Sequence, residues 1–166
     1  MKILTKIIVC FALINFEVNA EPHLEGHHHE HMKPIEIGVS VEAVRIDEEG
    51  EQNDVLGAHL HLIKKFSEIQ SLENFGYGLG SEILFAAERH YSIMASLAYF
   101  PYDEFAIIIS PGVEFAKHDG ETERQFSMHY ELTYSFTFKN FHFGPAISFS
   151  NTKESKHYGV GIHFGL

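Results

Sequence analysis

The closing stretch YGVGIHFGL, residues 158–166, alternates without interruption between large apolar side chains and small or polar ones. Its five large apolar residues share one parity, and three glycines and a histidine share the other. Alternate side chains of a β-strand point to opposite faces of the sheet, so this stretch predicts a strand with one bulky apolar face and one nearly empty face. The fold depends on which of these faces is inside.

The same alternation recurs along the chain after Pro34, in segments separated by turn-rich or charged breaks such as IDEEGEQND, KHDGETE and NTKESK. Between two of these segments, residues 64–74 could hold a helical turn, and no longer helix is expected. The pattern indicates an all-β meander. Its predicted strands are 35–45, 55–64, 75–86, 91–100, 104–117, 125–138, 141–150 and 157–166.

One face of these predicted strands is bulky and apolar throughout, while the other is small, hydroxylic or ionisable. The interior of an eight-stranded barrel is only just wide enough for side chains to fill, so the bulky set would be hard to fit inside. A glycine- and serine-rich face would also lack the charges that keep water-exposed strands soluble. We therefore expect apolar side chains outside, with glycine, serine, histidine and glutamate inside.

Such an exterior is favourable in a lipid bilayer, which a closed β-barrel can span because closure pairs every backbone N–H and C=O. Strands of about ten residues and an even strand number also match bacterial outer-membrane barrels. The predicted fold is an eight-stranded antiparallel up-and-down transmembrane β-barrel over residues 35–166, with aromatic girdles at both ends. The alternative is a soluble lipocalin-like carrier, with the bulky face inside around an apolar ligand.

The first twenty residues are typical of a secretory signal peptide. Lys2 and Lys6 precede the apolar run IIVCFALINF, and the small residues of VNA at 18–20 suit cleavage after Ala20. This run is shorter than the roughly 20 residues that a membrane-spanning helix needs. The single cysteine, Cys10, lies inside it, so no disulfide is expected in the mature chain.

Residues 21–34, EPHLEGHHHEHMKP, predict a flexible histidine-rich leader in the periplasm. Imidazole and carboxylate groups are suitable ligands for Zn, Cu or Ni. Strand direction also places three barrel histidines and Glu36 at similar depth near the periplasmic end. It places the remaining inward ionisable residues nearer the outer half, namely Glu42, Glu82, Glu114, His129 and Glu131. The candidate metal ligands are His23, His27, His28, His29 and His31 in the leader, and His61, His142 and His163 in the barrel. A solvated tail and a lumen of mutually paired polar side chains are the alternatives.

Several stretches resemble a group of small, mostly uncharacterised Gram-negative outer-membrane β-barrel proteins with a histidine-rich N-terminal leader. They are the signal peptide, the leader, SPGVEF at 110–115, FGPAISF at 143–149 and the closing strand. The resemblance implies outer-membrane lipid and lipopolysaccharide as surroundings. The closing strand also resembles the signal read by the barrel assembly machinery, although such signals commonly end in Phe or Trp rather than in Leu166.

The sequence gives little support for catalysis or nucleic-acid binding. SFSN at 148–151 is similar to the His-x-Ser-Asn motif of the outer-membrane lipid A deacylase, but Ser148 stands where the general base should be. A formal net charge of −11 disfavours nucleic acid, which is bound through Lys and Arg. We expect a monomeric, non-enzymatic barrel with a structural or interaction role and divalent-metal binding. The alternative is a narrow channel for metal ions or small solutes.

Overall fold

The computed structural model describes residues 35–48, 50–66, 69–86, 89–118, 121–138 and 141–166. The signal peptide predicted at 1–20 and the leader predicted at 21–34, with its five histidines, lie outside these ranges. Among the described residues, no helix is both long and apolar enough to cross a membrane.

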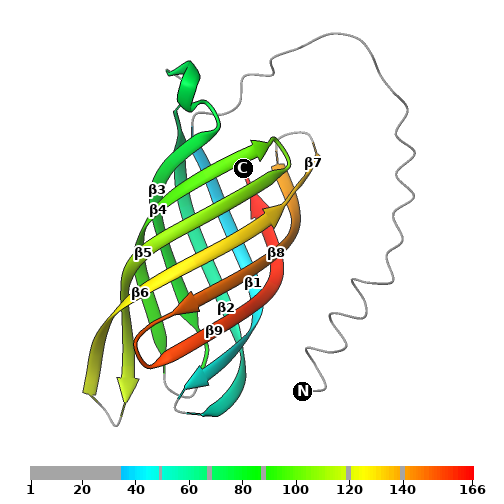
Figure 1. Ribbon diagram of the computed structural model, residues 1–166. Helices are drawn as coiled ribbons and strands as arrows, with labels where there is room; N and C mark the ends of the chain where they lie inside the picture. The colour runs from blue at the N-terminus through cyan, green and yellow to red at the C-terminus, as the bar shows by residue number, and fades with distance from the viewer. Residues whose placement is uncertain (1–34, 49, 67–68, 87–88, 119–120, 139–140) are drawn as a thin grey trace. The chain divides into compact units, whose positions relative to one another are not determined.

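Antiparallel strands make up nearly all of the described chain (Figure 1). They are β1 (Ile35–Glu48), β2 (Glu51–Lys65), β3 (Phe75–Leu84), β4 (His90–Tyr102), β5 (Phe105–His118), β6 (Glu121–Tyr134), β7 (Phe136–Phe138), β8 (Phe141–Asn151) and β9 (Ser155–Gly165). A 3-10 helix, η1 (Gln70–Leu72), lies between β2 and β3, where the sequence predicted a helical turn. Each predicted strand is present, and several extend further than expected.

The sheet closes on itself as a barrel of eight strands, as predicted. β1 pairs with both β2 and β9, and β6 pairs with β8 to complete the ring. β6 and β7 keep one register on β8 and form a single strand interrupted at Ser135. Gly144 lies opposite this interruption, where any side chain would collide with the Tyr134 carbonyl, so the close approach of the two strands requires glycine.

The orientation of the strands is the one predicted, with the bulky apolar face outside. Phe141, Ile147, Ile162 and Phe164 are 40%, 57%, 42% and 48% exposed, while His163 between them is 1% exposed. The lipocalin-like alternative required these four side chains to share a dry centre. That alternative is therefore wrong.

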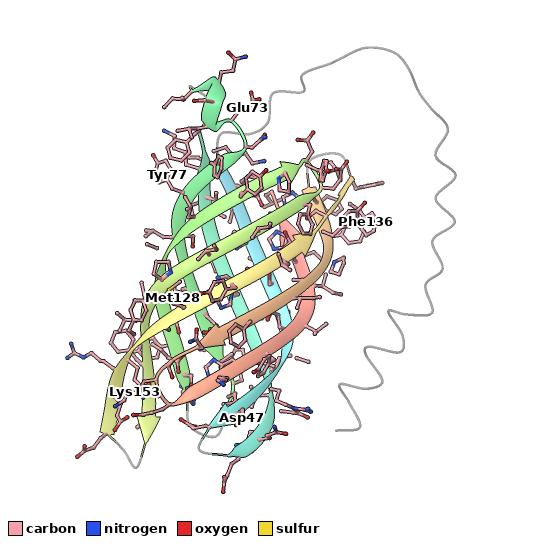
Figure 2. The ribbon with its side chains drawn as sticks, in the orientation of Figure 1. Asp47, Glu73, Tyr77, Met128, Phe136 and Lys153 are labelled. Carbon is pink, nitrogen blue, oxygen red and sulfur yellow. The ribbon has the colours of Figure 1, made fainter. Side chains whose placement is uncertain are left out.

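Aromatic side chains gather at both ends of the barrel exterior. We call the end that holds Ile35 and Leu166 the termini end, and the opposite end the far end. At the termini end the rings of Phe75 and Tyr99 lie 4.9 Å apart, and at the far end those of Tyr91 and Phe115 stack at 4.7 Å. Figure 2 labels Tyr77 and Phe136 near the termini end and Lys153 near the far end. This placement agrees with the two predicted girdles.

The interior is polar in the middle and partly apolar at its two ends, which the sequence did not predict. One buried apolar cluster lies towards the termini end and contains Ile63, Ala98, Phe100, Ala106 and Ile108. A second, of Val44, Ile46 and Leu84, lies towards the far end. The polar layer between these clusters holds most of the buried histidines and glutamates.

Candidate metal centre in the barrel lumen

Inward-facing positions of β1, β2 and β9 bring the lumen histidines together. On β1, Gly38 pairs with His61 of β2, and Ser40 pairs with both His59 and His163. A methyl group on Gly38 would overlap the rings of His61 and His163. These two rings stack with their centroids 5.0 Å apart. A glycine at this point in β1 thus creates the space that the imidazoles occupy.

The three barrel histidines predicted as metal ligands lie in one group with Glu36, as strand direction indicated. His142 Nε2 is 3.3 Å from His163 Nε2 and 3.3 Å from Glu36 Oε1. His163 Nε2 lies 3.9 Å from the same carboxylate oxygen, and the stacked His61 ring adjoins His163. We call Glu36, His61, His142 and His163 the termini-end group. Its placement agrees with the prediction, and metal binding by it stays a prediction.

A second group of ionisable side chains lies deeper in the lumen, and the sequence analysis did not predict that they come together. Glu131 Oε2 is 2.8 Å from His59 Nδ1, 3.8 Å from His61 Nδ1 and 4.0 Å from His129 Nε2. All four side chains are between 0% and 2% exposed. We call His59, His61, His129 and Glu131 the central group, which shares His61 with the termini-end group.

The central group has an unusual number of polar atoms without hydrogen-bond partners. Both ring nitrogens of His59, His61 and His129 are buried and unpartnered, and so is Glu131 Oε2. Two of these atoms, His59 Nδ1 and Glu131 Oε2, lie 2.8 Å apart as an ion pair. An unsatisfied buried polar group costs about 1–3 kcal/mol, so the remaining nitrogens of this group need a physical explanation.

Ser40 anchors the carboxylate of the central group from β1. Its hydroxyl donates a hydrogen bond of 2.8 Å to Glu131 Oε1 and lies 3.2 Å from His163 Nδ1. The carboxylate is thereby held by one oxygen, while the other faces the three imidazoles. In many metal sites of proteins, a carboxylate ligand is oriented by a hydrogen bond of this kind.

A third cluster, His90, Glu114 and His157, lies nearer the far end, and sequence reasoning missed both histidines. His90 Nδ1 is 3.0 Å from Glu114 Oε1, and His157 Nε2 is 3.1 Å from Ser155 Oγ. His90 lies one residue before the strand predicted at 91–100, and His157 is the first residue of the strand predicted at 157–166. Continuing the alternation by one or two residues at the strand ends would have placed them inside.

The sequence also misplaced part of the central group in depth. His129 and Glu131 were expected nearer the outer half of the barrel, but the structure places Glu131 Oε2 3.8 Å from His61 Nδ1 and 4.0 Å from His129 Nε2. The strands are strongly tilted (Figure 1), so counting residues along each strand misjudges the height of a side chain. β2 and β6 also lie on opposite sides of the ring, four strands apart in either direction. Their side chains meet across the lumen.

Comparison with protein-family models found no match, and comparison with curated proteins found no similar sequence. Solved structures do resemble the chain. Neisserial surface protein A (NspA) superposes with a TM-score of 0.61 at 8% identity, over 81% of this chain and 97% of that one. Ail, the attachment invasion locus protein of Yersinia pestis, gives 0.54 at 16% identity, over 81% and 100%. A de novo designed transmembrane β-barrel gives 0.52 at 11% identity, over 81% and 98%. The chain therefore has the β-barrel fold of these proteins.

Proposed function

We propose that this chain is a monomeric integral outer-membrane β-barrel protein without catalytic activity, with a structural or interaction role and the capacity to bind divalent metal ions. The observation that carries the proposal is the outward apolar face with polar side chains enclosed. In water, a barrel with this exterior would expose a continuous apolar surface, whereas in a bilayer the same surface contacts lipid chains favourably. The barrel fold shared with NspA, Ail and a designed transmembrane barrel supports the same environment.

The proposed topology follows from the even number of strands. Both ends of the barrel chain lie at the termini end, which we assign to the periplasm, together with the histidine-rich leader left after signal cleavage. The exterior would then contact outer-membrane lipid and, at the far end, lipopolysaccharide. The closing strand would be the segment read by the barrel assembly machinery during insertion.

The filled lumen favours a closed barrel over the alternative of a narrow channel for metal ions or small solutes. Buried side chains from β1, β2, β6 and β9 meet across its centre, and apolar clusters lie towards both ends. As for partners, Ail was solved with the heparin analogue sucrose octasulfate, which is polyanionic. A chain with 23 acidic and 12 basic residues is poorly suited to such a ligand.

Gel mobility of the full chain tests the membrane assignment. We expect the purified protein to require detergent or lipid for solubility. In unboiled samples it should migrate differently from boiled ones, because closed membrane barrels resist SDS until heated. A protein that stays soluble without detergent, with identical mobility before and after boiling, would contradict the assignment.

Metal binding is proposed for two sets of histidines, with Zn, Cu or Ni as the ions. One is His61, His142 and His163 in the barrel, and the other is the leader set at positions 23, 27, 28, 29 and 31. Isothermal titration of the full chain with each ion tests whether either set binds. Heats equal to those of buffer alone for all three ions would remove this part of the proposal.

A further inference from the structure

We propose that the central group is a buried binding site for one divalent transition-metal ion, with His59, His61, His129 and Glu131 as its ligands. The donor set of three imidazoles and one carboxylate is suited to Zn²⁺. This inference rests on the proposed metal-binding function and locates it one layer deeper than the predicted barrel site.

The geometry of the four side chains is close to that of a coordination sphere. Four donors at 2.0–2.1 Å from a tetrahedral Zn²⁺ are separated from one another by about 3.3 Å. The three nitrogens lie 2.8, 3.8 and 4.0 Å from Glu131 Oε2. Ligand atoms of His59, His61 and Glu131 all lie within 4.8 Å of one another. Small side-chain movements would bring these donors to bonding distance.

The unpartnered nitrogens point to a ligand independently of these distances. An ion bound by His59 Nδ1, His61 Nδ1, His129 Nε2 and Glu131 Oε2 would satisfy four of the seven atoms that lack hydrogen-bond partners. Two of these four donors, His59 Nδ1 and Glu131 Oε2, already lie 2.8 Å apart. Ser40 would act as the positioning residue, because it holds the carboxylate through its other oxygen.

The charge balance of the lumen also favours a cation. Four glutamates are buried inside the barrel, Glu42, Glu82, Glu114 and Glu131, and no Lys or Arg is buried with them in the described part of the chain. Buried carboxylates need a compensating partner. A divalent ion among four such groups would supply positive charge at the centre of the lumen, where the buried ionisable side chains of the described residues are glutamates and histidines.

The other two clusters are less suited to hold the ion, because fewer of their atoms lack hydrogen-bond partners: apart from the shared His61, these atoms are Glu114 Oε2 and His157 Nδ1 of the third cluster. In the termini-end group, Glu36 contacts His142 and lies 4.0 Å from Lys65 Nζ, while His163 is shared between Ser40 and His142. In the third cluster, His90 pairs with Glu114 and His157 with Ser155.

The termini-end group instead provides an entry path. Glu36 and His142 are partly exposed, and His61 belongs to both groups. An ion could pass from these side chains to the buried imidazoles by exchanging one ligand at a time. At the far end, Val44, Ile46 and Leu84 pack together, and the buried third cluster lies beside them, with Ile46 paired to His157 and Leu84 paired to His90.

Cobalt titration of the full chain in detergent tests the site, because tetrahedral Co²⁺ has visible absorption bands that report its ligands. The leader histidines at 23, 27, 28, 29 and 31 are first replaced by serine, so that they do not compete. We expect this leader variant to bind one Co²⁺, displaceable by Zn²⁺. His129→Gln or Glu131→Gln on the same background should weaken binding more than about 100-fold, and Ser40→Ala about 10- to 100-fold. His157→Gln, a buried histidine of the third cluster, is the matched control and should leave binding unchanged.

Each contrary outcome identifies what has failed. If the leader substitutions abolish all binding, the leader is the site, so the central site is overturned while metal binding stands. If His142→Gln removes the cobalt spectrum and His129→Gln preserves it, the ion lies in the termini-end group and the central site is again overturned. If the unmodified chain binds no Co²⁺, Zn²⁺, Cu²⁺ or Ni²⁺, both proposals fall.

A second measurement avoids lumen substitutions that disturb folding. X-ray absorption at the zinc edge of the loaded leader variant should show three imidazoles and one carboxylate oxygen. The spectrum should be unchanged by His142→Gln, because the termini-end group offers the same types of ligand. Two or fewer imidazoles would overturn the assignment. Unboiled gel mobility reports whether each variant has folded before it is titrated.

Discussion

At the residue scale, Gly38 shows how one missing side chain organises the lumen. It lies on β1 between the rings of His61 and His163, which stack across it. The alternation in the sequence indicated only that this position faces inward. It could not indicate which rings lie beside it, because those rings come from the two neighbouring strands.

Gly38→Ala should destabilise the barrel by about 1–3 kcal/mol, because the added methyl group overfills a packed interior. Gly80→Ala is the control: a methyl group there would lie 3.2 Å from His59 Nε2 and Ser96 Oγ, a tight contact, whereas on Gly38 it would overlap two imidazole rings. Urea unfolding in lipid vesicles measures both. Equal effects from the two substitutions would show that Gly38 is not a special position.

At the element scale, each strand has a lipid face and a lumen face. A charge placed on the lipid face should lower the free energy of unfolding more when it lies deeper in the bilayer. Ile147 is 57% exposed near the middle of β8, where it pairs with Leu132 and Val160. Ile35 is 48% exposed at the first position of β1. If the exterior faced water instead, replacing either residue by a charged one would change the free energy of unfolding little.

Ile147→Arg should lower the free energy of unfolding by about 2–4 kcal/mol, and Ile35→Arg by about 0–1 kcal/mol. The difference arises because an arginine at the bilayer centre loses its hydration, whereas one at the edge keeps it. Unfolding of both variants from lipid vesicles measures the difference. Small, equal losses would indicate that the exterior faces water.

The strand limits show how far local pattern extends. Alternation placed every strand, yet β1, β2 and β6 extend past their predicted limits into charged residues such as Asp47 and Asp54. There, Arg45 Nε donates a hydrogen bond of 2.8 Å to Asp54 Oδ1 across the hairpin. Charged residues can continue a strand when the neighbouring strand also continues and pairs with them. The local sequence of one strand does not show where its neighbour ends.

At the scale of the whole molecule, closure determines which side chains meet. β2 and β6 face one another across the ring, so His59 reaches Glu131 although 71 positions separate them in the sequence. The same closure fills the lumen with buried polar side chains and places one apolar cluster towards each end.

In planar bilayers, the folded protein should therefore show no steady conductance under conditions in which an open porin conducts. The central side chains occupy the space that ions would need. Reproducible single-channel steps from the purified protein, absent from a mock preparation, would contradict a closed lumen and support the channel alternative.

The sequence by itself determined which face of every strand is apolar and that this face lies outside. Parity is a local property, and the bulk of Phe, Tyr, Leu and Ile excludes them from a narrow interior. It also placed His61, His142, His163 and Glu36 at one depth, because each lies within four residues of the end of its strand at the termini end, so little error builds up in counting. Only the tertiary structure decided that His59, His129 and Glu131 join His61 at the centre. Strand tilt and ring closure set that meeting, and both depend on the pairing of all eight strands at once.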